Sequence, residues 1–242
     1  MEEYEQNIKN GDAFVKKEKF MDAIREYTKA YDAISEDDIK AEICYKLSQC
    51  YSSLDHKSTE NPLKYAEESL ELHHKLGDNE LEVMDLINIG YIYLDSGKRE
   101  DGISYFNKAI EAADAIKDVT LFALSNNAKA EALSSLKSKQ AEAMKIYDNV
   151  LELTEKSEDW ENYFEALYGK ISILRDADIN AAFDAGKAGL DKIDTVMNTI
   201  KTKKDKKEFK DSVSYLYDSV SDIAMELENI DEAMKIASRS KE

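Results

Sequence analysis

The chain has 242 residues, 35% of them charged, and a formal net charge of −18. It contains one proline and eight glycines, too few turn residues for a fold with many strands, and its Lys, Glu, Ala and Leu content favours helix throughout. The acidic balance disfavours nucleic acid and anionic membrane as partners, because both are polyanions. It favours a basic partner, or serves only solubility.

Helix-forming stretches follow one another in pairs along the chain. Asn61-Pro62 reads as a helix start, and Gly77 and Gly97 read as helix stops. The predicted pairs are 2–17 with 19–34, 37–54 with 61–76, 79–96 with 98–116, 119–137 with 139–156, 158–175 with 178–200, and 207–228 with 230–241. We expect a single all-α domain over 1–242, with repeats near 2–34, 37–76, 79–116, 119–156, 158–200 and 207–241.

A packing pattern repeats in register with these pairs and is clearest at 86–109, which reads LINIGYIYLDSGKREDGISYFNKA. Large, small and aromatic residues alternate there at helical spacing: Leu86, Ile89, Gly90 and Tyr93, then Gly102, Phe106 and Ala109. Small residues allow two helices to approach closely, and one hairpin cannot bury its apolar stripe alone. Fainter copies have their small position at Gly11, Ser48, Ala130, Lys170 (or Gly169) and Ser221.

This pattern resembles the tetratricopeptide repeat. The resemblance implies a right-handed superhelical solenoid of about six antiparallel helix pairs, in which the first helix of each pair lines a concave groove. The long helices and linkers are similar to the 40-residue repeats of adaptor and peptide-sensing members, and members are mostly protein-binding scaffolds rather than enzymes. Members that bind chaperone C-termini have a Lys and an Asn in the first helix; the matching positions here are Ile8 and Asp12, which speaks against that function.

Groove-facing residues should lie at i and i+4 on each first helix. This spacing, with acidic residues added at the flanks, predicts a groove with an apolar-aromatic middle: Asp12, Tyr45, Gln49, Ile87, Tyr91, Asp95, Asn127, Glu131, Leu167 and Ile171, with Asp218, Asp222 and Glu226 beyond them. Such a surface suits a peptide or helix with apolar anchors and Lys or Arg. The alternative for the apolar members is that they are core residues.

The sequence offers little for catalysis or for metal binding. Adjacent His73 and His74 point about 100° apart on a helix and do not easily share an ion, so we expect an exposed pair without function. No phosphate-binding, dinucleotide, nucleophile-elbow or zinc-protease motif occurs. The lysine run within 201–210 reads as a solvated link, with contact to an acidic partner, a phosphate or the protein's own acidic surface as the alternative. We therefore expect no catalytic residue, cofactor or metal.

Cys44 and Cys50 are the only cysteines, and their spacing suits neither a redox nor a metal motif. We expect free, mostly buried thiols in a reducing compartment. The acidic N-terminal segment is unlike a signal peptide, and no apolar run reaches the roughly 18 residues of a membrane span. These features predict a cytoplasmic protein.

Together these features predict a non-catalytic interaction scaffold that binds a protein or peptide in an acidic and aromatic groove. One alternative is a peptide-sensing regulatory domain. The other is a self-assembling structural repeat protein; the oligomeric state is open, with a homodimer as one option.

Overall fold

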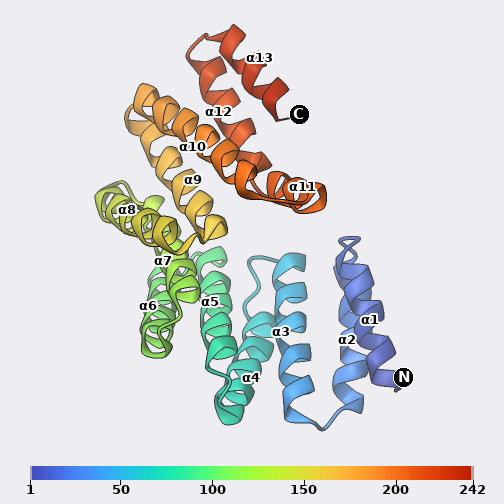
Figure 1. The fold of residues 1–242 in the computed structure, drawn as a ribbon. Coiled ribbons are helices and arrows are strands. Elements are labelled where there is room, and N and C mark those ends of the chain that lie inside the picture. Colours follow the sequence, from blue (N-terminus) through green and yellow to red (C-terminus); the bar gives the residue numbers. More distant parts are fainter. Residues whose placement is uncertain (1, 241–242) are drawn as a thin grey trace. The chain divides into compact units, whose positions relative to one another are not determined.

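The computed structural model describes residues 2–240, and in that range the chain is all-α (Figure 1). Its elements, in chain order, are α1 (Glu3–Val15), α2 (Phe20–Ala33), α3 (Asp37–Leu54), α4 (Glu60–Leu76), α5 (Asn79–Asp95), α6 (Arg99–Ile116), α7 (Val119–Ser134), the 3-10 turn η1 (Lys137–Lys139), α8 (Gln140–Ser157), α9 (Trp160–Ala177), α10 (Ile179–Thr199), α11 (Lys203–Ser212), α12 (Ser214–Glu226) and α13 (Ile230–Arg239). The predicted all-α fold is confirmed, and the predicted boundaries hold to within a few residues as far as α10.

The chain divides into two compact units, Met1–Ala132 and Leu133–Glu242, with the boundary inside α7. We call them unit 1 and unit 2. The expectation of one continuous domain stays a prediction. No helix in the described part of the chain is long and apolar enough to cross a membrane.

In unit 1 each helix packs on the next one along the chain, from α1 to α6. Glycines at the predicted small positions allow this close packing. A Cβ atom on Gly11 would lie 2.4 Å from the ring of Tyr27, and one on Gly90 would lie 2.4 Å from the ring of Phe106. A Cβ atom on Gly102 would lie 2.8 Å from the Gly90 carbonyl oxygen. The aromatic residue of one helix therefore occupies the space that the glycine of its partner leaves open.

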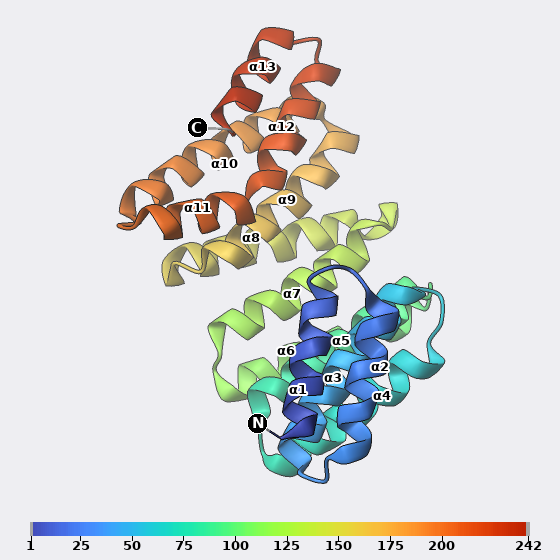
Figure 2. The same cartoon turned by 90° about the vertical axis from the view of Figure 1, so that its right-hand side faces the viewer.

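In unit 2, α9 packs between α8 and α10, and α10 and α13 pack on α12 (Figure 2). Gly169, the alternative small position of the fifth copy, faces the preceding helix α8. A Cβ atom there would lie 2.3 Å from Tyr147 on α8, so Gly169 admits the aromatic residue of the preceding helix. Gly186 has the corresponding role toward Val220 on α12.

The predictions for 201–228 are wrong in two respects. The lysine run forms the helix α11 instead of a solvated link, and the Thr202 hydroxyl caps this helix by accepting a hydrogen bond from the Asp205 amide at 3.0 Å. The expected single helix 207–228 is broken at Val213, which separates α11 from α12. Val213 is buried in the core of unit 2, and burying its side chain favours this break.

Cys44 and Cys50 are free and buried, as predicted. Burial, with a further contribution from Glu68, raises the pKa of Cys44 to about 12, and burial raises the pKa of Cys50 to about 11. Since the thiolate is the reactive form, we expect neither thiol of the native protein to react with Ellman's reagent within minutes at pH 8. Both should react at once in denaturant, and fast labelling of the native chain would contradict this arrangement.

Candidate functional site

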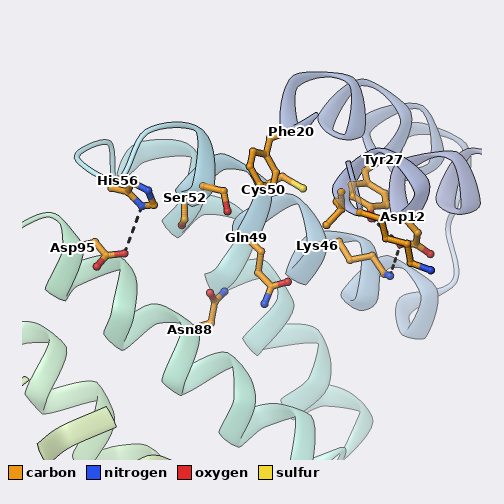
Figure 3. A pocket seen from close by; sticks show the side chains of 13 residues that line it. Asp12, Phe20, Tyr27, Lys46, Gln49, Cys50, Ser52, His56, Asn88 and Asp95 are labelled. Atoms are coloured by element: carbon orange, nitrogen blue, oxygen red, sulfur yellow. Dashed lines mark hydrogen bonds and ion pairs between the residues drawn. The ribbon is translucent and has the colours of Figure 1, made fainter. Parts of the chain in front are cut away.

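Unit 1 has a cleft of about 560 Å³ between α1, α3 and α5, with the start of α2 and the loop after α3 at its rim (Figure 3). It is lined by Asp12, Val15, Lys16, Phe20, Tyr27, Lys46, Gln49, Cys50, Ser52, Ser53, His56, Asn88 and Asp95. We call it the first cleft. The first helices of the first three helix pairs thus contribute side chains to one surface.

An ion pair with one additional hydrogen bond lies at one end of the first cleft. The Asp12 carboxylate accepts hydrogen bonds from the Lys46 ammonium and from the Tyr27 hydroxyl, both at 2.7 Å. Burial alone would raise the pKa of Asp12, but these two hydrogen bonds outweigh it and lower the pKa below its usual value. Burial and the Asp12 carboxylate together raise the pKa of Tyr27. The Asp12 charge is therefore held in place by two donors.

Amides and a second, looser pair occupy the other end. The Nδ1 atom of His56 lies 3.8 Å from the Asp95 carboxylate. The Asn88 amide donates a hydrogen bond to the Ser48 hydroxyl at 2.9 Å. In Figure 3, Gln49 and Asn88 lie between the Asp12–Lys46 pair and the His56–Asp95 pair. An amide side chain carries both a donor and an acceptor, which is what the backbone of an extended peptide requires.

A second cleft of about 540 Å³ adjoins the first, because Lys46 and Gln49 line both. The remaining lining residues of this second cleft are Asp38, Ile39, Glu42, Tyr45, His73, Leu81 and Met84. Four of these are apolar or aromatic and two are acidic. The second cleft thus offers an apolar floor with carboxylates beside it.

His73 is buried, contrary to the prediction of an exposed histidine pair. Its Nδ1 atom lies 2.6 Å from the Asp85 carboxylate, and Asp85 is fully buried. Burial raises the pKa of Asp85 in spite of the opposing hydrogen bond from His73. His74 is exposed, as predicted, and lies 3.0 Å from Glu82.

Ser69, His73 and Asp85 are not a catalytic triad. The Ser69 hydroxyl lies 3.5 Å from the same Nδ1 atom that faces Asp85, whereas a triad needs its nucleophile on the opposite ring nitrogen. The Ser69 hydroxyl itself donates to the Ala41 carbonyl at 3.1 Å. No group of three potential metal ligands lies together among the described residues.

The predicted groove residues fall into three groups. Asp12, Gln49 and Asp95 line the first cleft, and Tyr45 and Gln49 line the second. The Tyr91 hydroxyl donates to Glu131 at 3.0 Å on a part of unit 1 outside both clefts. The other four are buried instead of groove-facing, which corrects the prediction for them: Ile87, Asn127, Leu167 and Ile171.

On α5, the helix face predicted to line the groove is rotated from the face that lines the clefts. The positions Ile87 and Tyr91 were matched to Tyr45 and Gln49 on α3, but Met84 and Asn88 line the clefts. These two residues correspond to Glu42 and Lys46 when the small positions Ser48 and Gly90 are aligned. A stripe at 42, 46, 49 and 53 on α3 thus continues at 84, 88 and 95 on α5, as one face of a helix with 3.6 residues per turn requires.

Residues 86–115 match the family model of the tetratricopeptide repeat. A search among curated proteins finds no match. Three solved structures with the same fold are aspartyl phosphate phosphatase F from Bacillus subtilis (TM-score 0.72, 19% identity, 99% of this chain and 69% of that chain), a Rap protein complexed with competence and sporulation factor (0.65, 16%, 99% and 74%), and NprR in complex with its cognate peptide NprX (0.51, 16%, 92% and 71%).

At these identities the similarity establishes the fold. Both the matched repeat and the fold agree with the packing of Gly90 against Phe106, which lie inside 86–115. The chain therefore contains a tetratricopeptide repeat at 86–115, within an all-α fold that is similar to those of these solved structures.

Proposed function

We propose that this chain is a non-catalytic binding module, which takes a peptide or an extended segment of a partner protein in the two adjoining clefts of unit 1. The observation that carries the proposal is the shared wall: Lys46 and Gln49 on α3 line both clefts. An extended segment lying across α3 would contact both of them without any rearrangement of the helices.

The chemistry of the two clefts supports a peptide with both apolar and basic residues. In the second cleft, Ile39, Leu81 and Met84 would bury an apolar side chain, and Asp38 and Glu42 would face a basic one. In the first cleft, Gln49 and Asn88 would hydrogen-bond the peptide backbone. The two solved structures complexed with competence and sporulation factor and with NprX add support from the fold.

The absence of catalysis is part of the proposal. Tyr27 and Lys46 both donate to Asp12. Burial alone would lower the pKa of Lys46, but its hydrogen bonds to Asp12 and Glu42, together with the charges of these carboxylates, raise this pKa above its usual value. A charged lysine cannot act as a nucleophile or base. The Lys46 ammonium is therefore suited to binding and not to reaction.

Gln49→Trp should weaken peptide binding, because Gln49 is exposed at the junction of the clefts and an indole there would occupy space in both. Heptapeptides would be selected from a random display library against the wild-type chain, and their affinities measured by calorimetry. We expect a loss of about tenfold or more, with unchanged helicity by circular dichroism.

Gln140→Trp in unit 2 is the matched control and should bind the selected peptides like the wild type. Equal binding by Gln49→Trp would show that the two clefts are not the site. Selected peptides with acidic residues in place of basic ones would contradict the expected charge preference.

A further inference from the structure

The second cleft contains two polar groups that the proposed function does not use. They are the hydroxyl of Tyr45 on α3 and the imidazole of His73 on α4. Both line the cleft together with the apolar side chains of Ile39, Leu81 and Met84. The cleft therefore combines an apolar surface with two hydrogen-bonding groups, which is the surface that an amphipathic side chain requires.

The His73 ring is held in place by the buried carboxylate behind it. His73 is only 4% exposed, and its Nδ1 atom lies 2.6 Å from Asp85, which is fully buried on α5. Since one edge of the ring faces Asp85, the Nε2 atom on the other edge is the one left to face the cleft. Among the described residues no group hydrogen-bonds to this Nε2 atom. A nearly buried nitrogen of this kind favours a ligand that supplies the missing partner.

The Tyr45 hydroxyl is the second group of this kind. Tyr45 is half-buried, and no hydrogen bond to or from its hydroxyl is formed within residues 2–240. Burial, and then the charge of Asp85, raise the pKa of Tyr45. The hydroxyl therefore keeps its proton and can donate it to a ligand. The same buried carboxylate thus acts on both polar groups of the cleft.

A hydroxyl group on the ligand matches this pair of atoms. It can donate to Nε2 of a neutral imidazole or accept from Nε2 of an imidazolium, and it can also accept from the Tyr45 hydroxyl. An ammonium group or an indole N–H only donates, so it cannot accept from Tyr45. Serine, threonine and the amide side chains lack an apolar body large enough to cover Ile39, Leu81 and Met84. Tyrosine has both the hydroxyl and the apolar ring.

We propose that the second cleft is a binding site for a tyrosine side chain of the peptide or partner protein. The ring packs against Ile39, Leu81 and Met84. The hydroxyl hydrogen-bonds to His73 Nε2 and to the Tyr45 hydroxyl. This inference rests on the proposed function, because the tyrosine belongs to the segment that lies across α3, and it names the side chain that the cleft selects. A phenylalanine there would cover both polar groups without giving either of them a partner.

The test uses the full chain with N-acetyl-tyrosinamide, and with N-acetyl-phenylalaninamide as the compound that lacks only the hydroxyl. The chain has three histidines, so nitrogen-15-labelled histidine gives few side-chain resonances in nuclear magnetic resonance spectra. Spectra of His56→Ala and His74→Ala identify the other two histidines, and hence His73. We expect the tyrosine compound to shift the His73 Nε2 resonance and to bind about three- to tenfold more tightly than the phenylalanine compound. Equal affinities, or no shift at His73, would overturn the proposal.

Tyr45→Phe removes one hydroxyl from the cleft and keeps the ring. It should weaken binding of the tyrosine compound about threefold or more and leave binding of the phenylalanine compound unchanged, with unchanged helicity by circular dichroism. Tyr51→Phe is the matched control, since it removes a hydroxyl from the same helix outside both clefts, and it should keep the full preference for tyrosine. An undiminished preference in Tyr45→Phe, or an equal loss in Tyr51→Phe, would overturn the proposal.

Peptides selected from the display library separate this inference from the proposed function. We expect them to carry a tyrosine whose replacement by phenylalanine weakens binding to the wild type more than to Tyr45→Phe. Peptides that need no tyrosine but bind Gln49→Trp more weakly would overturn the tyrosine site and leave the proposed function intact. A His73 shift with the tyrosine compound, together with peptides that bind Gln49→Trp like the wild type, would support the tyrosine site and refute binding across both clefts.

Discussion

Phe106→Ala should lower the free energy of unfolding by about 3–5 kcal/mol. The Phe106 ring is fully buried in the core of unit 1. It lies against Gly90 and meets the Tyr91 ring edge to face at 5.1 Å. Truncation removes these contacts and leaves a cavity between α5 and α6, which two helices that already touch through Gly90 and Gly102 cannot close by moving nearer.

Urea denaturation followed by circular dichroism measures this loss. Trp160, the only tryptophan, lies in unit 2, so its fluorescence follows the other unit in the same samples. We expect the circular dichroism transition of Phe106→Ala to begin at lower urea. A free energy within about 1 kcal/mol of the wild type would show that Phe106 is not the packing residue of this hairpin.

Gly90→Ala tests the same contact from the other side. Its Cβ atom would lie 2.4 Å from the Phe106 ring, so we expect overpacking to cost about 1–3 kcal/mol. The smaller side chain of Phe106→Leu leaves room for the Cβ atom of Gly90→Ala. The double variant Gly90→Ala, Phe106→Leu should therefore be more stable than the sum of the two single changes predicts, and strict additivity would contradict direct contact.

This hairpin also shows why the fold could be predicted from the sequence. Gly90 and Phe106 are packing residues whose types follow from the space available between two helices, and that requirement repeats in each copy. The helix stop at Gly77 has a local cause as well, because this residue is the left-handed C-cap of α4, whereas α4 begins at Glu60, two residues before the predicted start at Pro62. Where a local cause was weaker, at Val213, the prediction of one unbroken helix was wrong, because burial of that side chain in unit 2 decided the break.

The candidate site could be predicted only in part, because its residues meet through tertiary contacts. Asp12 and Lys46 are 34 residues apart in sequence and hydrogen-bond at 2.7 Å, and no spacing rule on one helix reveals such a pair. Gln49 was identified because it lies next to the small position Ser48. On α5 the same spacing selected Tyr91 and the buried Ile87 in place of Met84 and Asn88.

A cleft at the break between α11 and α12 in unit 2 shows a further limit of the helical spacing rule. Glu161, Glu165 and Tyr168 could have been recognised as one helix face, but Tyr215 joins them only because α12 starts anew after Val213. The sequence-based groove placed acidic residues on α12 at Asp218 and Asp222 instead. A break in a helix thus created a surface that the repeat pattern does not contain.

His73→Ala should cost about 3–5 kcal/mol near neutral pH, because it leaves the Asp85 carboxylate buried without its partner. Asp85 is fully buried, its Oδ2 atom faces His73 at 2.6 Å, and its Oδ1 atom has no hydrogen-bond partner. Ser69 also lowers the pKa of Asp85, but less than His73 does, and its hydroxyl donates to the Ala41 carbonyl. His74→Ala, on the exposed neighbour, is the control and should change stability by less than about 1 kcal/mol.

The pH dependence identifies the cause, since a cavity left by His73 would cost the same at every pH. Burial raises the pKa of Asp85 in the folded chain above an unfolded value of about 3.9. A carboxyl group shifted in this direction contributes stability that is fully present below its unfolded pKa and is lost as pH rises through its folded pKa. Removing His73 removes the larger of the two hydrogen bonds that oppose the shift, so the loss of stability with rising pH should be larger in His73→Ala. Adding Asp85→Asn abolishes this titration. The titration of all other groups is common to His73→Ala and the double variant, and so cancels in the difference between them. We therefore expect His73→Ala, measured by urea denaturation, to be about as stable as the double variant near pH 4 and clearly less stable at pH 7. A difference in unfolding free energy between the two variants that does not change with pH would mean that the cost is one of packing.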